Sequence, residues 1–293
     1  MTEIMFNPSQ IATLLFMQQG EITEYYIYKK IAAAQKDTNT RELLTRIAED
    51  ELGHYRIWKR YTQQEVVPNT FRILFYYLIA RVLGITFAIK LMEGVEKKPR
   101  SYDKALLDKI PEMPEILTNQ ETHERELIAL IDEDRLKYTG SIVLGLNDAL
   151  VEFVGMLAGL TFALQNSQII AVAGLITGVA ASLSMGSSEY LSQKSEGAAT
   201  DPKKAALYTG LTYIATVALL ILPFLVLVSP YYALLFTLMV AVLVIFLFTF
   251  YLSVAEDFPF WRRFAEMLAI SFGIAAISFV IGLIIRTVLH VNL

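Results

Sequence analysis

The sequence predicts an all-α protein in two parts, a four-helix bundle over residues 1–139 and a membrane domain of five spanning helices over residues 140–293. Apolar side chains recur at helical spacing through the first part, which also carries most of the charge. Long apolar segments make up the second part. Hydrophobic residues fill 55% of the 293 positions and the mean hydropathy is +0.46, which is too apolar for an ordinary soluble protein.

Composition also limits the classes of function. The chain has no cysteine, so disulfides, thiolate metal sites and cysteine nucleophiles are excluded. Its net charge of −4 does not suggest nucleic-acid binding. The first thirty residues are amphipathic, without a basic start followed by an apolar core, so we expect no signal peptide.

Four helices are expected before residue 140. The second begins after the cap-like stretch Asp37-Thr38-Asn39, and the fourth begins after a proline-containing loop. The third includes an apolar segment, residues 71–92, that three cations interrupt, with Arg81 at its centre, which argues against a membrane span. The expected helices run from Pro8 to Gln35, from about residue 40 to Gln64, from Thr70 to Lys97, and onward from Pro114.

Carboxylates and histidines occupy the helix faces that should be buried. Burying such groups without a partner is costly, so they need a shared one. Four-helix bundles that bind two metals take single glutamates from two helices and Glu-x-x-His pairs from the other two. Here Glu21 and Glu93 are the single residues, and Glu51 with His54 forms one pair. A structural bundle with ordinary buried ion pairs is the alternative.

With Glu96 three residues after Glu93, this pattern resembles the rubrerythrin branch of the ferritin-like family over about residues 8–135. The resemblance implies two iron ions, or iron, manganese or zinc, in the bundle. The fourth helix departs from the pattern, because Gln120 stands three residues before His123, where a glutamate is expected; Glu124 or Glu121 is a substitute. The candidate metal ligands are Glu21, Glu51, His54, Glu93, Glu96, Gln120, His123 and Glu124.

Helix lengths predict how the bundle assembles. Glu51 lies about 13 residues before the break between the second and third helices, and Glu93 lies about 23 residues after it, so a simple hairpin would separate them by ~15 Å. We therefore expect helices 1–2 of one chain to complete the site with helices 3–4 of another.

Five apolar segments follow, each long enough to cross a membrane. Basic residues gather on one side of them, and the turns on the other side carry no charge, so the bundle should be cytoplasmic and the C-terminus outside the plasma membrane of a prokaryote. The fourth bundle helix should continue through residues 132–137 into the first span and couple the domains rigidly. The segments are residues 141–164, 168–191, 205–228, 231–254 and 265–289.

Acids lie inside the first two spans. Asp148 and Glu152 are four residues apart, as are Met185 and Glu189, so each pair shares a helix face. An ionised carboxylate at membrane depth costs ~2.5–3.5 kcal/mol even on insertion scales, so such residues usually mark an ion path. Two alternatives are that these helices lie on the membrane surface, or that the acids cap helices at the cytoplasmic mouth.

The motif Gly145-Leu-Asn-Asp148 through Glu152, with Ser184-Met185 followed by Glu189-Tyr190, resembles the vacuolar iron transporter family over about residues 140–290. The resemblance implies a homodimer that moves Fe²⁺ or Mn²⁺ out of the cytosol against protons, with Asp148 and Met185 at the intramembrane metal site. We add Glu152 and Glu189 to this path because they lie one turn further along.

Plant and yeast-type members carry an acidic insertion between spans two and three, which is a short loop here. The N-terminal bundle takes its place, as in bacterial membrane-bound ferritins. The sequence thus favours a proton-coupled metal exporter whose bundle collects, oxidises or senses iron. The alternative is a membrane-anchored diiron oxidase or peroxidase; a pure sensor would need an output domain, and none is recognisable.

Overall fold

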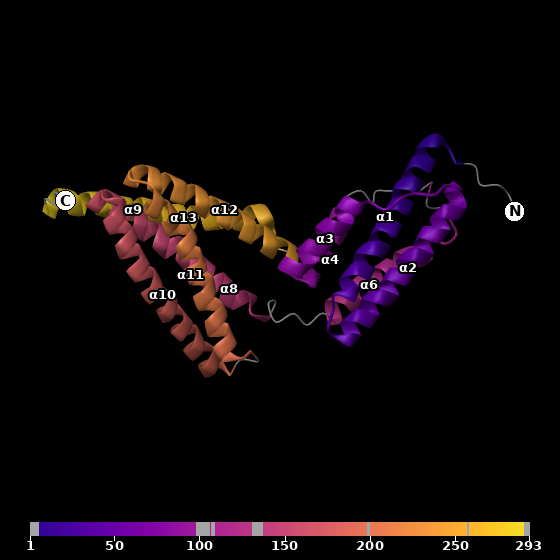
Figure 1. Ribbon diagram of the computed structural model, residues 1–293, viewed down its shortest axis with the longest axis horizontal. Helices are drawn as coiled ribbons and strands as arrows, with labels where there is room; N and C mark the ends of the chain where they lie inside the picture. The colour runs from indigo at the N-terminus through magenta and orange to yellow at the C-terminus, as the bar shows by residue number, and fades with distance from the viewer. Residues whose placement is uncertain are drawn as a thin grey trace. The chain divides into compact units, whose positions relative to one another are not determined.

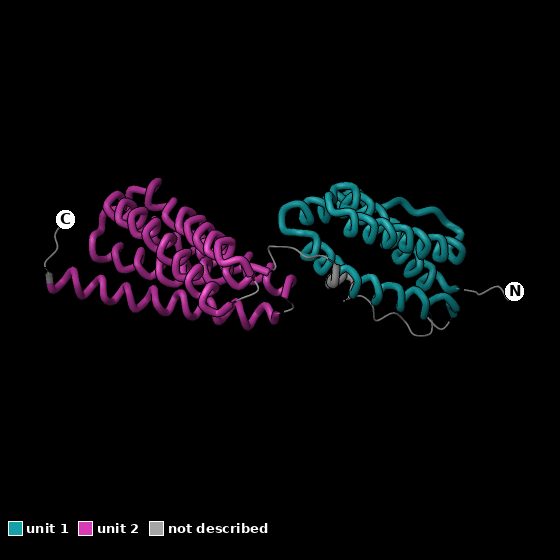
Figure 2. The backbone as a smooth tube through the Cα atoms, turned by 90° about the horizontal axis from the view of Figure 1, so that it is seen from below, with its two compact units in different colours: residues 1–133 teal, residues 134–293 magenta. Residues whose placement is uncertain are grey.

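The predicted all-helical architecture is confirmed (Figure 1). The chain divides into two compact units, residues 1–133 and residues 134–293 (Figure 2). The computed structural model describes residues 6–97, 106, 109–130, 137–197, 200–256 and 258–289. Residues 131–136 lie outside this set, and so does the predicted continuous helix between the bundle and the first span.

The first unit is built on a hairpin of two long helices, α1 (Pro8–Ala33) and α2 (Thr38–Thr62), which lie side by side (Figure 1). Both begin at good caps. Asn7 and Gln10 form a reciprocal capping box at the start of α1, and Asp37 accepts a hydrogen bond from the Thr40 amide at the start of α2. The helix α6 (Met113–Leu130) packs against α2.

The predicted third helix is broken. It forms α3 (Thr70–Leu83) and α4 (Ile85–Lys97), separated by Gly84 with φ of 105°. Only glycine adopts such a backbone angle without strain, so Gly84 ends α3. The apolar segment at residues 71–92 hides this break, because helical spacing continues across it.

The break in the third helix bears on the predicted exchange of helices between chains. Ala88, Ile89 and Met92 of α4 are buried in the same hydrophobic cluster as side chains of α1 and α2. The length mismatch that suggested helix exchange between chains assumed a straight third helix, and that assumption was wrong. Helix exchange stays a prediction, but it no longer has this support.

The second unit contains five helices long and apolar enough to cross a membrane, as predicted. In the first of them, α8 (Thr139–Asp148) and α9 (Val154–Leu164) are joined by one π-helical segment, η1 (Ala149–Phe153). The other four are α10 (Ser167–Glu196), α11 (Pro202–Val226), α12 (Pro230–Ala255) and α13 (Phe260–Leu289).

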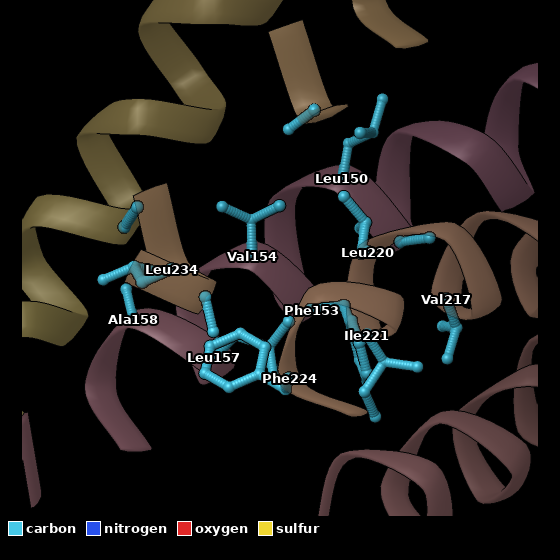
Figure 3. Close-up of a cluster of buried hydrophobic side chains, with 14 of the residues drawn as sticks. Leu150, Phe153, Val154, Leu157, Ala158, Val217, Leu220, Ile221, Phe224 and Leu234 are labelled. Carbon is cyan, nitrogen blue, oxygen red and sulfur yellow. The ribbon is translucent and has the colours of Figure 1, made fainter. Parts of the chain in front are cut away.

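Close helix packing holds the acid-bearing helices in place. Phe153 and Leu157 pack against Ile221 and Phe224 of α11 in the buried core (Figure 3). Small residues permit this approach, because a Cβ on Gly178 would lie 2.4 Å from Val217. The first span, α10 and α11 therefore form one packed group.

Candidate functional site

Three predicted metal ligands converge in the first unit. Glu21 on α1 and Glu51 and His54 on α2 are buried, and one ligand atom from each lies within 4.8 Å of the others. We call these three residues the metal cluster. They meet because the α1–α2 hairpin faces its acidic positions inward, on the same stripe as the apolar core.

Two polar atoms of the metal cluster lack a hydrogen-bond partner in the described structure. His54 Nδ1 lies 3.1 Å from Glu51 Oε2 and 3.5 Å from Glu21 Oε2. Within the described part of the chain, Glu21 Oε2 and His54 Nε2 are buried without a hydrogen-bond partner. Buried polar atoms normally have partners, and an unmade bond costs about 1–3 kcal/mol, so these atoms fit a bound cation.

A third helix brings His123 to the same place. On α6, His123 Nδ1 lies 3.5 Å from Glu51 Oε1, and its ring centroid lies 6.5 Å from that of His54. Its other nitrogen, Nε2, is 2.9 Å from Asp50 Oδ2. Asp50 therefore orients the imidazole so that Nδ1 faces the cluster, which is the usual outer-shell role of a carboxylate beside a metal-binding histidine.

The remaining predicted ligands are not part of the metal cluster as described. Glu93 and Glu96 belong to α4 and Glu124 to α6, but their side chains lie outside the described residues. Gln120 is half-buried on α6, one turn before His123, and is not part of the metal cluster. The described ligand set is therefore Glu21, Glu51, His54 and His123.

Burial and mutual contact set the protonation of the cluster. Burial, reinforced by the nearby Glu51 carboxylate, raises the pKa of Glu21 to about 8. Burial opposes ionisation of Glu51, but hydrogen bonds with Glu21, His123 and His54 hold its pKa below the usual range. Burial also opposes protonation of His54, but the two carboxylates raise its pKa to about 10. A divalent cation that binds here must displace protons.

Two neighbours of this cluster were not among the predicted site residues. Trp58 is fully buried, and its indole Nε1 donates a 3.1 Å hydrogen bond to Glu21 Oε1. Asp50 sits next to Glu51 in sequence, about 100° away around the helix, so the helical pattern assigns it to another face. For Trp58 a sequence signal exists, because it lies four residues after His54 on the same stripe.

In the second unit, the first pair of acids lies at an irregular point of its helix. Asp148 ends α8 and is half-buried, while Glu152 lies within the π-helical segment η1 and is exposed on the surface of this unit. Tyr213 of α11 is fully buried, and its hydroxyl donates to Glu152 Oε2 at 3.4 Å. Single π-helical turns occur frequently at functional sites.

The second pair lies on α10. Glu189 is buried and accepts hydrogen bonds from Ser141 Oγ at 2.7 Å and from Gln193 Nε2 at 3.1 Å. Because Ser141 precedes Asp148 by two helical turns, Glu189 is about 10 Å from the level of Asp148 along α8. Met185, half-buried, lies one turn nearer the middle of α10. Asp148 and Glu152 therefore lie together on the first span, and Glu189 of α10 lies at a different level along it.

Among the described residues, the donors that contact Glu152 and Glu189 are neutral. Glu152 accepts from a phenol, and Glu189 accepts from a hydroxyl and an amide. A membrane carboxylate neutralised by lysine or arginine would serve structure, whereas one that faces neutral donors keeps its capacity for a cation or a proton. This arrangement leaves Glu152 and Glu189 able to accept a cation or a proton.

Two protein-family models match parts of the chain. The model of the VIT family matches residues 139–201, which contain all four predicted transport-path residues. The model of ubiquinone biosynthesis protein COQ7, a ferritin-like diiron family, matches residues 12–96, which contain the metal cluster. No curated protein and no solved structure gives a significant match.

The two matches support a ferritin-like domain followed by a membrane domain similar to the VIT family. The matches imply diiron binding for the first and metal-ion transport for the second. The predicted ferritin-like and membrane classes are confirmed, and the narrower resemblance to rubrerythrins stays a prediction.

Proposed function

We propose that the protein exports Fe²⁺ or Mn²⁺ across the plasma membrane of a prokaryote in exchange for protons. The observation that carries this proposal is the coincidence of the VIT match with the acids of the first two spans, whose contacting donors are neutral. The N-terminal unit then lies in the cytoplasm and the C-terminus outside, as the distribution of basic residues predicts.

Asp148 and Met185 hold the ion in this proposal. Carboxylate oxygen and thioether sulfur together suit a borderline cation such as Fe²⁺. Glu152 and Glu189 extend the path on either side, and each carboxylate binds the metal or a proton but not both. Proton entry then restores the protonated acids after the metal leaves, which couples the two movements.

A homodimer completes the path. Glu152 is exposed on the surface of a membrane unit, where contact with lipid would be costly for a carboxylate. A second copy that covers this surface would remove that cost and bring two sets of acids together. Exchange of bundle helices between the two copies is compatible with the same dimer.

The cytoplasmic bundle collects iron in this scheme. Glu21, Glu51, His54 and His123 would hold the metal, and an iron pair when bound supplies redox chemistry with oxygen or peroxide. The chain's own residues bind the ions, exclude water and give up protons. The match to COQ7 favours a second candidate function, a membrane-anchored diiron oxidase or peroxidase.

Metal flux into proteoliposomes separates the two. We would compare the wild type with Asp148→Asn and Glu51→Ala, and use Glu256→Gln, an exposed acid at the end of α12, as the matched control. Export predicts that Asp148→Asn abolishes Fe²⁺ and Mn²⁺ flux and that the control retains it. Loss in Asp148→Asn alone would make the bundle regulatory, and loss in Glu51→Ala as well would make it the supplier. No flux in any form would refute transport and favour the enzyme.

A further inference from the structure

The helix α3 carries an apolar face that the described residues of the first unit leave uncovered. Its buried side chains, Tyr76 and Ala80, point into the core with α1 and α2. On the opposite side four large apolar side chains are exposed, and we call them the α3 stripe. They are Phe71, Leu74, Phe75 and Leu78, with exposed fractions of 75%, 49%, 44% and 51%.

These four residues form one continuous line. Their spacing of three and four positions places them on a single helix face. Soluble proteins rarely expose a contiguous apolar patch of this kind unless something binds there. Figure 1 shows α3 beside α1, and the two helices are in contact.

Cations flank the stripe. At about 100° per residue, Arg72 and Arg81 lie roughly 80–100° to either side of the line through Phe71 and Leu78. Between Glu65 and Glu93 the sequence contains no acid, although the whole chain has a net charge of −4. An exposed apolar stripe with basic residues along both margins is the pattern of a helix that lies in the plane of an anionic membrane surface.

The chain also keeps this unit near a bilayer. Leu130 ends α6 and Thr139 begins the first candidate span, and nine residue steps reach at most about 30 Å. A surface tethered so closely meets lipid at high effective concentration. Even a weak interfacial helix then stays bound.

Pairing of the stripe with α3 of a second copy is less favourable. An antiparallel pair centred between Phe75 and Leu78 would place the two arginines of each chain along the margins of the contact, and a parallel pair would do the same. The helix carries no acid to offset either contact. Like charges across an interface select against that partner.

We propose that α3 docks the metal-binding unit on the anionic surface of the membrane that the second unit spans. The stripe enters the headgroup region, and Arg81, which is exposed at its margin, contacts lipid phosphates. Docking would hold the metal cluster close to the membrane from which the ion path starts, whether or not the path transports metal.

The absence of cysteine makes the test direct. The full chain with Leu78→Cys, labelled with an environment-sensitive fluorophore, is reconstituted in phosphatidylglycerol–phosphatidylcholine vesicles containing lipids brominated near the headgroup. Glu42→Cys, at an exposed position of α2, is the matched control. We expect blue-shifted, quenched emission at position 78 and unquenched emission at position 42.

Charge is tested in the same system. Quenching at position 78 should weaken in phosphatidylcholine alone and in Arg81→Glu. Absence of quenching at position 78, or equal quenching at both positions, would overturn the proposal. Disulfide-linked dimers of the unlabelled Leu78→Cys chain, without quenching of the labelled chain, would overturn it too and identify a second copy as the occupant.

Discussion

The indole of Trp58 donates a 3.1 Å hydrogen bond to one oxygen of Glu21 and leaves the other oxygen, Oε2, buried and without a partner in the described structure. Trp58 has no exposed surface, so the bond is protected from water. It fixes Glu21 with a single oxygen free for a metal, and it makes the tryptophan a direct neighbour of the site.

Replacing this tryptophan should weaken metal binding without unfolding the bundle. Outer-shell changes typically cost about 10–100-fold in metal affinity, and we expect Trp58→Phe to fall in that range for Co²⁺. Calorimetric titration measures the affinity, and Trp261→Phe, at a residue 75% exposed in the other unit, is the control. Equal affinities in the two variants would show that Glu21 needs no such support.

Fluorescence gives an independent measurement. Trp58 and Trp261 are the two tryptophans of the chain, so Trp58 alone emits in the Trp261→Phe variant. A paramagnetic ion such as Co²⁺ at the metal cluster should quench that emission with one saturable transition. Emission unchanged by Co²⁺ would place the ion elsewhere.

Metal binding to the first unit should strengthen as pH rises. The pKa of Glu21 is raised to about 8 and that of His54 to about 10, so both hold protons at pH 6 that a cation must displace. Each displaced proton strengthens binding about tenfold per pH unit until the pH passes the pKa. Zn²⁺ competition titrations at pH 6, 7 and 8 measure this slope, and a flat profile would contradict it.

The raised pKa of Glu21 has the opposite effect on the stability of the metal-free fold, which should fall as pH rises. Glu21 binds its proton more tightly when folded, since its pKa rises from 4.5 to about 8. Its stabilising contribution is therefore complete below about pH 4.5 and is lost as pH rises through 8. Thermal unfolding of the chelator-treated protein should show less loss between pH 5 and 8 in Glu21→Gln than in the wild type.

Sequence patterns predicted the helices and the first ligands because both depend on helical period. Glu21, Glu51 and His54 lie on inward stripes of two helices whose ends are set by strong caps at Asn7 and Asp37. Contacts between helices could not be predicted in this way. Asp50 contacts His123 from a position outside the inward stripe, and the helical repeat of the sequence does not predict a contact of this kind.

The membrane half shows the same limit. Length and hydropathy predicted the five spans. The acids inside them were identified as candidate site residues because acids are rare in apolar segments. Hydropathy does not distinguish a π-helical turn from an α-helical one, so the segment η1 was missed, and with it the exposure of Glu152. Gly84 was missed for a related reason, because a glycine in an apolar run reads equally as a packing residue or a break.

Packing of the first span on α11 depends on Gly145. A Cβ at this position would lie 2.3 Å from the carbonyl oxygen of Thr209, a backbone atom that cannot move aside alone. Gly145→Ala should therefore destabilise the membrane unit by about 1–3 kcal/mol, the usual cost of overpacking. Gly273→Ala on α13, where a Cβ meets no atom within 4 Å, is the matched control. In thermal unfolding experiments in detergent, the midpoint temperature should be lower than that of the wild type only for Gly145→Ala.

The contact between Tyr213 and Glu152 predicts a transport defect that leaves the fold intact. Tyr213→Phe keeps the buried ring and removes the hydroxyl that donates to Glu152 at 3.4 Å. We expect Mn²⁺ flux into proteoliposomes to fall about tenfold, in line with the loss of one hydrogen bond to a charged group. Tyr232→Phe, at an exposed position of α12, removes a hydroxyl away from the acids and should retain wild-type flux. Full flux in Tyr213→Phe combined with full flux in Glu152→Gln would remove Glu152 from the ion path and leave Asp148 and Met185 as its core.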